Sequence, residues 1–246
     1  RVVTVKALEG LMKGSSRTAD KVSAASALGD IFGKGSVSFF GPCVWVRDKA
    51  ASAVEALTGA LRDELHPDVK ESAVRALGDI LGKASGSFRL EDLEEVDGGM
   101  SCDSMLAVED LELDDISAMG RLEDAMARAV AELANALVAN QTTDGTLKVS
   151  IASALGDFLG NASGHFHDYF HGVTRATEKA VASLTTALRS SEAAVRVSAA
   201  SALGDIFGKG SVDFLGPRAS VKTWAVAALT SALRDADAAV RASALR

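Results

Sequence analysis

Three of the four histidines lie together in the stretch HFHDYFH at 165–171. If this stretch were helical, His167 and His171 would share one face, with His165 or Asp168 nearby, and imidazole is a common ligand of zinc, copper and nickel. The stretch contains no HExxH pattern, and no cysteine or second carboxylate cluster accompanies it. We therefore expect an exposed polar loop, with a metal site at His165, His167 and His171, and a metal-binding enzyme built on it, as the alternative.

The string GDIFGKGS at 29–36 is superficially similar to a phosphate-binding loop. Its glycine-to-lysine spacing is one residue shorter than in GxxxxGK[ST], and Gly35 stands where that motif has serine or threonine. It also lies at the end of an expected helix, which offers carbonyl groups, whereas an anion needs the amide groups of a helix N-terminus. The string occurs in four related copies, which favours a structural role for the aspartates that they contain: Asp30, Asp79, Asp157 and Asp205.

No pattern typical of a catalytic centre accompanies these residues. The sequence has no GxSxG, no cysteine with a histidine nearby, and no His-Glu dipeptide. One aspartate per copy does not make an acid–base pair. We therefore expect a protein that is not an enzyme, with no catalytic residue and no cofactor.

An internal repeat defines the elements that would position these residues. SALGDIFGKGS occurs at 26–36 and 201–211, with related strings RALGDILGKAS at 75–85 and SALGDFLGNAS at 153–163. Asp30 and Asp79 are 49 residues apart, Asp79 and Asp157 are 78 apart, and Asp157 and Asp205 are 48 apart. The long interval equals one period plus about 30 residues. A fifth copy begins as AAVRASALR at 238–246.

Each copy predicts two amphipathic helices. Apolar residues in the first helix recur at steps of three and four residues, the period of one helix face. They are Val5, Leu8, Met12; Val54, Leu57, Leu61; Val130, Leu133, Leu137; Val181, Leu184, Leu188; and Val226, Leu229, Leu233. The second helices are rich in alanine and serine, which lets neighbours approach closely. The glycines at 33, 82, 160 and 208 are expected to follow the second helices with a positive φ.

Two polar residues recur around the start of each second helix. A basic residue stands seven positions before the leucine of ALGD, and a residue with a side-chain oxygen stands six positions before that in each copy. The basic residues are Lys21, Lys70, Lys148, Arg196 and Arg241, and the oxygen-bearing ones are Ser15, Glu64, Thr142, Ser190 and Asp235. Two interpretations stay open: a polar ladder between adjacent repeats, which we favour, and a basic groove for a protein partner.

The segments ALRSSEAAVRVSAASALGDI (187–206) and ALRDADAAVRASAL (232–245) resemble the HEAT-repeat family, including its PBS-lyase HEAT-like and armadillo-type relatives. The resemblance covers nearly the whole chain outside residues 89–120, and the loops between repeats are longer than in the compact form. It implies an all-α fold, an α-solenoid of about five HEAT-like hairpins, used as a protein-binding scaffold. Because the PBS-lyase branch includes bilin-attaching proteins, it also implies a bilin lyase or chaperone-like factor as an alternative.

A phenylalanine follows each complete copy, eleven residues after the ALGD leucine. The four residues are Phe39, Phe88, Phe166 and Phe214. We expect each ring to be an anchor buried between successive repeats, worth about 1.5–3 kcal/mol. An exposed aromatic row that contacts a partner is the alternative.

Residues 89–120 interrupt the period and contain eleven acids and one base. The rest of the chain therefore carries about +3, although the whole chain carries −7. Leucines and other apolar residues alternate with the acids, a composition typical of a docking segment that orders on binding. A solvated loop without a partner, or a segment that folds back on the basic positions of its own solenoid, remain open.

The composition of the chain argues against several classes of function. A net charge of −7 and an isoelectric point near 5.2 argue against nucleic-acid binding, which needs clustered cations. No apolar run approaches the roughly 20 residues that span a bilayer. Cys43 and Cys102 make neither a disulfide framework nor a CxxC pair, which weakly favours an intracellular compartment, the cytoplasm or an organelle interior.

The predicted organisation is one solenoid domain over residues 1–246. Its repeats cover approximately 1–46, 47–88, 121–170, 175–217 and 219–246, with 89–120 as an acidic and flexible insertion. We expect a non-enzymatic scaffold or adaptor for protein partners, as a subunit of a larger assembly. Since the chain stops inside an expected helix, we expect another subunit or further sequence to cover its C-terminal end.

Overall fold

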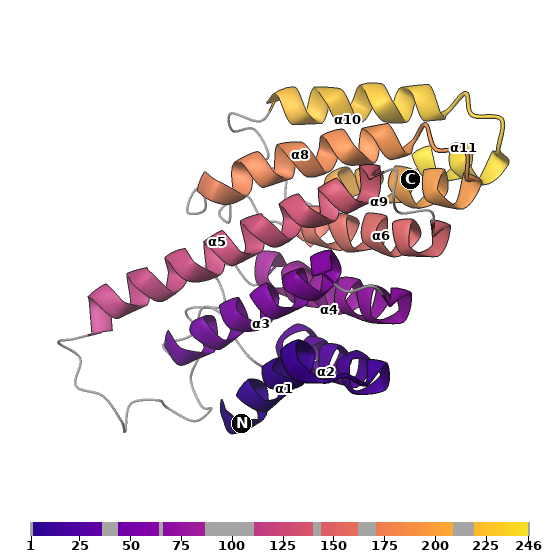
Figure 1. Ribbon diagram of the computed structural model, residues 1–246. Helices are drawn as coiled ribbons and strands as arrows, with labels where there is room; N and C mark the ends of the chain where they lie inside the picture. The colour runs from indigo at the N-terminus through magenta and orange to yellow at the C-terminus, as the bar shows by residue number, and fades with distance from the viewer. Residues whose placement is uncertain are drawn as a thin grey trace.

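The computed structural model describes residues 2–35, 44–63, 66–86, 111–139, 144–161, 171–208 and 219–245. Regular structure in these ranges consists of helices alone (Figure 1). The predicted all-α class is therefore confirmed. The helices are α1 (Val2–Gly14), α2 (Thr18–Gly29), the π-helical turn η1 (Asp30–Lys34), α3 (Val44–Asp63), α4 (Pro67–Gly86), α5 (Leu111–Val138), α6 (Gly145–Asn161), α8 (His171–Ala187), α9 (Ala193–Gly208), α10 (Ala219–Ala232) and α11 (Ala238–Ala244).

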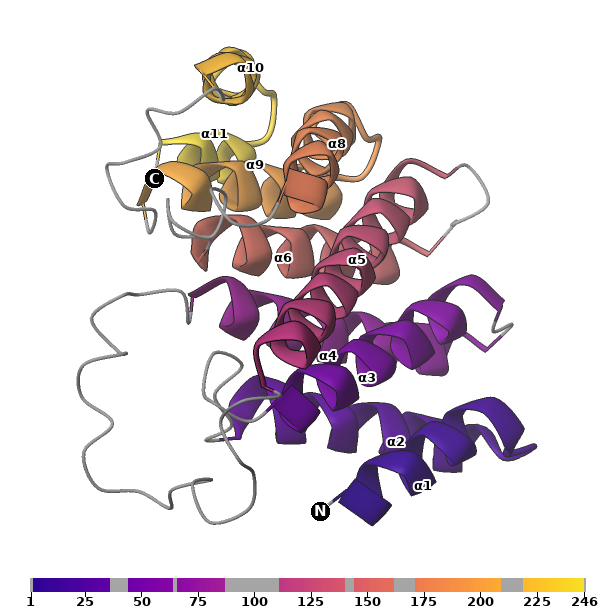
Figure 2. The same ribbon diagram turned by 90° about the vertical axis from the view of Figure 1, so that its left-hand side faces the viewer.

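Within the described ranges the helices form five hairpins, stacked in two layers. The hairpins pair α1 with α2, α3 with α4, α5 with α6, α8 with α9 and α10 with α11. Helices α1, α3, α5, α8 and α10 pack in chain order as the first layer, and α2, α4, α6, α9 and α11 form the second layer. Both views show the stack running from the N-terminal to the C-terminal hairpin (Figures 1 and 2). The predicted α-solenoid is thus confirmed.

The apolar stripes predicted for the first helices are buried in the middle of the stack. Val54 and Leu57 of α3 are fully buried, and so are their equivalents in α5 and α8. The last repeat differs from the prediction, because Val226 is 52% exposed and Leu233 is 38% exposed. Among the described helices, α10 has a first-layer neighbour on one side alone, so this part of its stripe has no helix to pack against.

Glycine and alanine set the distance between neighbouring second helices. A Cβ built on Gly156 of α6 would lie 2.9 Å from both the Cα and the Cβ of Ala202 in α9. Real Cβ atoms do not approach carbon atoms this closely, so the observed distance between the helices requires glycine here. The same contact recurs along the layer between Gly29 and Ala76 and between Gly78 and Ala154.

Serine hydroxyl groups join the same helices. The Ser72 Oγ donates a hydrogen bond to the Val22 carbonyl of the preceding repeat at 3.1 Å. The Ser198 Oγ donates to the Val149 carbonyl, again across one repeat and at 3.1 Å. Two helices must lie close together for so short a side chain to reach the neighbouring backbone, so these bonds depend on the glycine contacts.

Gly33, Gly82 and Gly160 do not terminate the second helices as predicted, whereas Gly208 is the last residue of α9. Gly82 and Gly160 lie inside α4 and α6, which continue to Gly86 and Asn161. Gly33 lies inside η1, where an added Cβ would be 2.5 Å from the Cβ of Asp79. At Gly33 the close approach of the next repeat therefore accounts for glycine.

Helix α5 begins earlier than the repeat predicts. It spans 28 residues from Leu111, so residues 111–120 of the expected insertion belong to the first helix of the third hairpin. Helices α3 and α8 also begin a few residues before the predicted repeat limits at 47 and 175. Acidic residues crowd the first turns of α5, and they hide the apolar stepping that marks a helix.

Replacement of Gly156 by alanine tests the contact between second helices. We expect Gly156→Ala to lower the free energy of unfolding by about 1–2 kcal/mol, because the new methyl group overpacks against the Ala202 backbone. Gly59→Ala is the matched control: an added Cβ there meets nothing within 4 Å, and alanine should raise helix stability by about 0.5–1 kcal/mol. Urea denaturation followed by circular dichroism measures both. Equal stabilisation by both substitutions would contradict the packing described.

Candidate functional site

Two rows of charged side chains run from repeat to repeat along the second layer. The basic residues share one helical position, since each donates its backbone N–H to the carbonyl four residues earlier, as Lys70 does to His66 at 3.3 Å. The aspartates of the ALGD string follow nine residues later in four repeats, about 14 Å along each helix. The basic row is Lys21, Lys70, Lys148, Arg196 and Arg241, and the acidic row is Asp30, Asp79, Asp157 and Asp205.

A shallow groove of about 390 Å³ lies between α2 and α4 on this face. The Lys34 Nζ lies 3.3 Å from the Asp30 Oδ1 and 3.3 Å from the Asp79 Oδ2, so it links the aspartates of two adjacent repeats. The carboxylates of Asp79 and Asp30 raise the pKa of Lys34. An ion pair between Arg75 and Glu71 lies on the same groove wall.

Arg196 makes the contact between adjacent repeats that the predicted polar ladder requires, at the junction of the last two repeats. Its Nε and Nη2 donate to the two carboxylate oxygens of Asp235 in the next repeat, at 2.9 and 3.1 Å. Its Nη1 donates to the carbonyls of Ser190 and Ser191 in its own turn. Both side chains of the pair are 16% exposed. Such a two-pronged contact fixes the orientation of one hairpin on the next.

Arg241 and the turn oxygens complete this edge of the stack. The Arg241 Nη1 donates to the carbonyls of Asp235 and Ala236, as Arg196 does one repeat earlier. The Ser15 and Ser190 hydroxyls accept from the amides two residues ahead, and so does the Asp235 carboxylate. These oxygens therefore order the turn before the second helix. Glu64 and Thr142 lie outside the described residues.

Lys21, Lys70 and Lys148 occupy the same position in the first three repeats and are half-buried. In the part of the chain that the structure describes, the side chains of Lys70 and Lys148 form no ion pair. The basic row thus has two parts: lysines on α2, α4 and α6 in the first three repeats, and arginines held by turn carbonyls in the last two.

A second groove, on the first layer, was not predicted. It measures about 320 Å³ and lies between α3 and α5. Ion pairs cross it: the Arg121 Nε and Nη2 lie 2.9 and 2.6 Å from the Asp48 Oδ1, and Arg128 pairs with Glu55. Both pairs join residues 73 positions apart. This shared offset is a signal in the sequence, but it identifies the pairs only once α3 and α5 are known to be neighbours.

Several predicted residues lie outside the described residues. These are the anchors Phe39, Phe88, Phe166 and Phe214, together with His165 and His167. His171 is the first residue of α8, and its side chain is also outside them. The described residues contain no group of three histidine, cysteine or acidic side chains arranged to hold a metal ion. None of the described helices is both long and apolar enough to cross a membrane.

No protein-family model and no curated protein matches this chain. Similar solved structures include an engineered protein that is 20% identical, with 98% of this chain and 93% of that chain covered and a TM-score of 0.39. A designed armadillo repeat protein is 15% identical, with 99% and 96% covered and a TM-score of 0.36. Another designed armadillo repeat protein, in complex with peptide (KR)4, is 15% identical, with 99% and 95% covered and a TM-score of 0.38. The helical-repeat fold assigned above rests on this chain's own helix packing.

Asp235→Asn tests the ladder through its pH dependence. The hydrogen bond from Arg196 holds the pKa of Asp235 below its ordinary value, so on acidification the unfolded chain takes up this proton before the folded protein does. The stabilisation is therefore complete above the ordinary aspartate pKa and is lost as the pH falls through the folded value. We expect Asp235→Asn to lower stability at neutral pH and to flatten the acid limb of the stability profile.

The matched control is Glu178→Gln, which removes an exposed carboxylate outside the ladder. Urea denaturation midpoints from neutral pH down to about pH 3 measure both variants. Identical acid limbs for the two variants would contradict the ladder.

Proposed function

We propose that the chain is a non-enzymatic scaffold that holds a protein partner along the solvent face of its second helices. The observation that carries this proposal is the shared register of the second layer, in which each helix places a basic residue at the same position. Stacked hairpins of this kind offer an extended surface, the geometry suited to a macromolecular partner. A polypeptide that crosses the helices between the two charged rows can pair with both.

The basic row supplies the partner contacts that we propose, at Lys21, Lys70, Lys148, Arg196 and Arg241. The arginines already bind turn carbonyls, so their side chains have fewer donors left for a partner. Lys70 and Lys148 lie on adjacent helices, α4 and α6, and form no ion pair with a described residue. We therefore place the strongest contacts at these two lysines.

The repeats act together in this proposal as one domain, with units near 1–46, 47–88, 121–170, 175–217 and 219–246. Each hairpin buries its apolar face against its neighbours, so the binding face holds its shape only while the whole stack is folded. A partner that spans several repeats would in turn stabilise the stack.

Charge reversal at the two lysines tests the proposed face. We expect the tagged chain to retain a partner from its native source and the Lys70→Glu/Lys148→Glu variant to lose it, because two cations of the row become anions. Glutamate is favourable near a helix N-terminus, so the variant should fold. Affinity purification with amine cross-linking and mass spectrometry is the measurement.

The matched control reverses two exposed lysines of α1, as Lys6→Glu/Lys13→Glu. It has the same net charge as the test variant and leaves the second layer unchanged. Equal retention of partners by both variants, with no cross-link at Lys70 or Lys148, would overturn the proposed binding face.

Removal of residues 89–110 tests whether the acidic insertion is a docking segment. The deletion stops before α5, which begins at Leu111. We expect the deleted chain to lose a subset of the partners that the full chain retains. Recovery of the same partners from both versions, in the same affinity purification, would show that the insertion has no docking role.

A further inference from the structure

The outward faces of α8 and α10 carry cations that have no acidic partner among the described residues. Arg175, Lys179 and Arg189 are exposed along α8 and its following turn, and Arg234 is exposed after α10. Within the described ranges none of these four side chains forms an ion pair. Glu178 is the one acid among the described residues of α8 and α10. This surface is therefore strongly positive in a protein whose net charge is −7.

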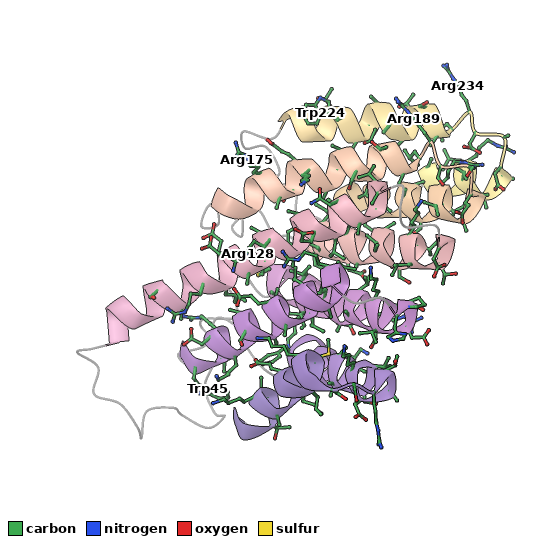
Figure 3. The ribbon with its side chains drawn as sticks, in the orientation of Figure 1. Trp45, Arg128, Arg175, Arg189, Trp224 and Arg234 are labelled. Atoms are coloured by element: carbon green, nitrogen blue, oxygen red, sulfur yellow. The ribbon has the colours of Figure 1, made fainter. Side chains whose placement is uncertain are left out.

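The exposed residues of the two helices are in register. At a constant offset of 45 residues, Lys179, Ala182 and Thr186 of α8 correspond to Trp224, Ala227 and Ser231 of α10, and Arg189 and Arg234 correspond in the turns that follow the two helices. All eight residues are exposed, and α8 and α10 pack against each other. Figure 3 shows Trp224 and Arg175 toward one end of the helix pair, with Arg189 and Arg234 toward the other. Arg175 lies 12 residues before Ala187, the last residue of α8, which is about 18 Å along the helix, and Arg189 lies in the turn after it.

The side chains in the middle of this surface are small and weakly polar. Ala182 and Ala227 lie between the two groups of cations, one on each helix. The Thr186 hydroxyl donates a hydrogen bond to the Ala182 carbonyl of its own helix at 3.0 Å, so its donor is already satisfied. Trp224 stands beside this strip with 51% of its surface exposed. Tryptophan and arginine are among the residues enriched in the energetic centres of protein interfaces.

The other end of the same layer provides an internal comparison. Counted from the buried valine of each first helix, Arg175 of α8 takes the position of Asp48 in α3, and Ala182 takes that of Glu55. Asp48 and Glu55 neutralise Arg121 and Arg128 across the groove between α3 and α5. The two acids that close that groove are therefore replaced on α8 by a cation and a methyl group.

We propose that the outward face of α8 and α10 binds an acidic segment of a partner protein, one that also carries apolar side chains. Carboxylates of the segment would pair with Arg175 and Lys179 at one end and with Arg189 and Arg234 at the other. Its apolar side chains would cover Trp224 and the alanine strip. Because it also requires a protein partner, this inference rests on the proposed function, but the surface belongs to the first layer.

The test uses the full chain in a Trp45→Phe background, so that tryptophan fluorescence reports on Trp224 alone. The probe is a labelled peptide of three Glu-Glu-Leu-Leu-Glu-Glu-Leu units, and the control peptide has glutamine at every glutamate. We expect the acidic peptide to bind, to shift the Trp224 emission to the blue, and to bind more weakly as salt is raised. The control peptide should not bind.

Two variants with the same charge change assign the binding to this face. Arg175→Glu/Lys179→Glu should lower the affinity for the acidic peptide by about tenfold or more, since two attractions become repulsions. Lys6→Glu/Lys13→Glu, on α1, should leave its affinity within about twofold. If the charge-reversed variant fails to fold, Arg175→Gln/Lys179→Gln replaces it. This milder variant should also weaken binding of the acidic peptide.

Three results would overturn the proposal. They are equal binding of the glutamine peptide, equal weakening by the α1 variant, and displacement of the acidic peptide by a single-stranded oligonucleotide of lower dissociation constant. Failure here leaves the proposed function standing if Lys70→Glu/Lys148→Glu still abolishes partner capture. If the Lys70→Glu/Lys148→Glu variant still captures the partner and the acidic peptide binds tightly to α8 and α10, the proposed binding face on the second layer is wrong, and the face on α8 and α10 stands.

Discussion

Direct contact between neighbouring second helices determines the architecture of this chain. The backbone of Gly156 lies against Ala202, and the same glycine–alanine contact recurs at two other junctions of the layer. At this short distance, serine hydroxyls reach the carbonyls of the preceding repeat. Larger side chains at these positions would separate the second helices, change the angle between hairpins, and break the hydrogen bonds that depend on the contact.

The two proposed binding surfaces follow from this packing in different ways. On the second layer, the small contact residues hold the helices in one register, so the basic and acidic positions recur as rows. On the first layer, larger apolar residues such as Val54 and Leu57 fill the space between the helices. The outward positions differ from repeat to repeat, as Asp48 of α3 and Arg175 of α8 do. Charges on that layer can therefore differ from one end to the other: they are neutralised over α3 and α5 and left positive over α8 and α10.

The sequence predicts the fold well because the repeat supplies several copies of each signal. Helix pairs, buried stripes and the Arg196 ladder could all be inferred from residues that recur at one position. It predicts less where a feature depends on a neighbouring helix. Glycine at position 33 was expected to adopt a positive φ, whereas the approach of Asp79 explains it. The ion pairs between α3 and α5, and the missing acids on α8, become visible only when the first helices are placed side by side. The start of α5 was missed because its first turns are acidic.

Nuclear Overhauser effects between the α-protons of the ALGD glycines and the alanine methyl groups of the next repeat test the central contact most directly. The structure predicts strong cross-peaks from Gly156 to the Ala202 methyl group, and equivalent ones at the other two junctions of the second layer. Cross-peaks from these glycines to leucine or valine methyl groups of the first layer, with none to the alanines, would contradict the stacking described here.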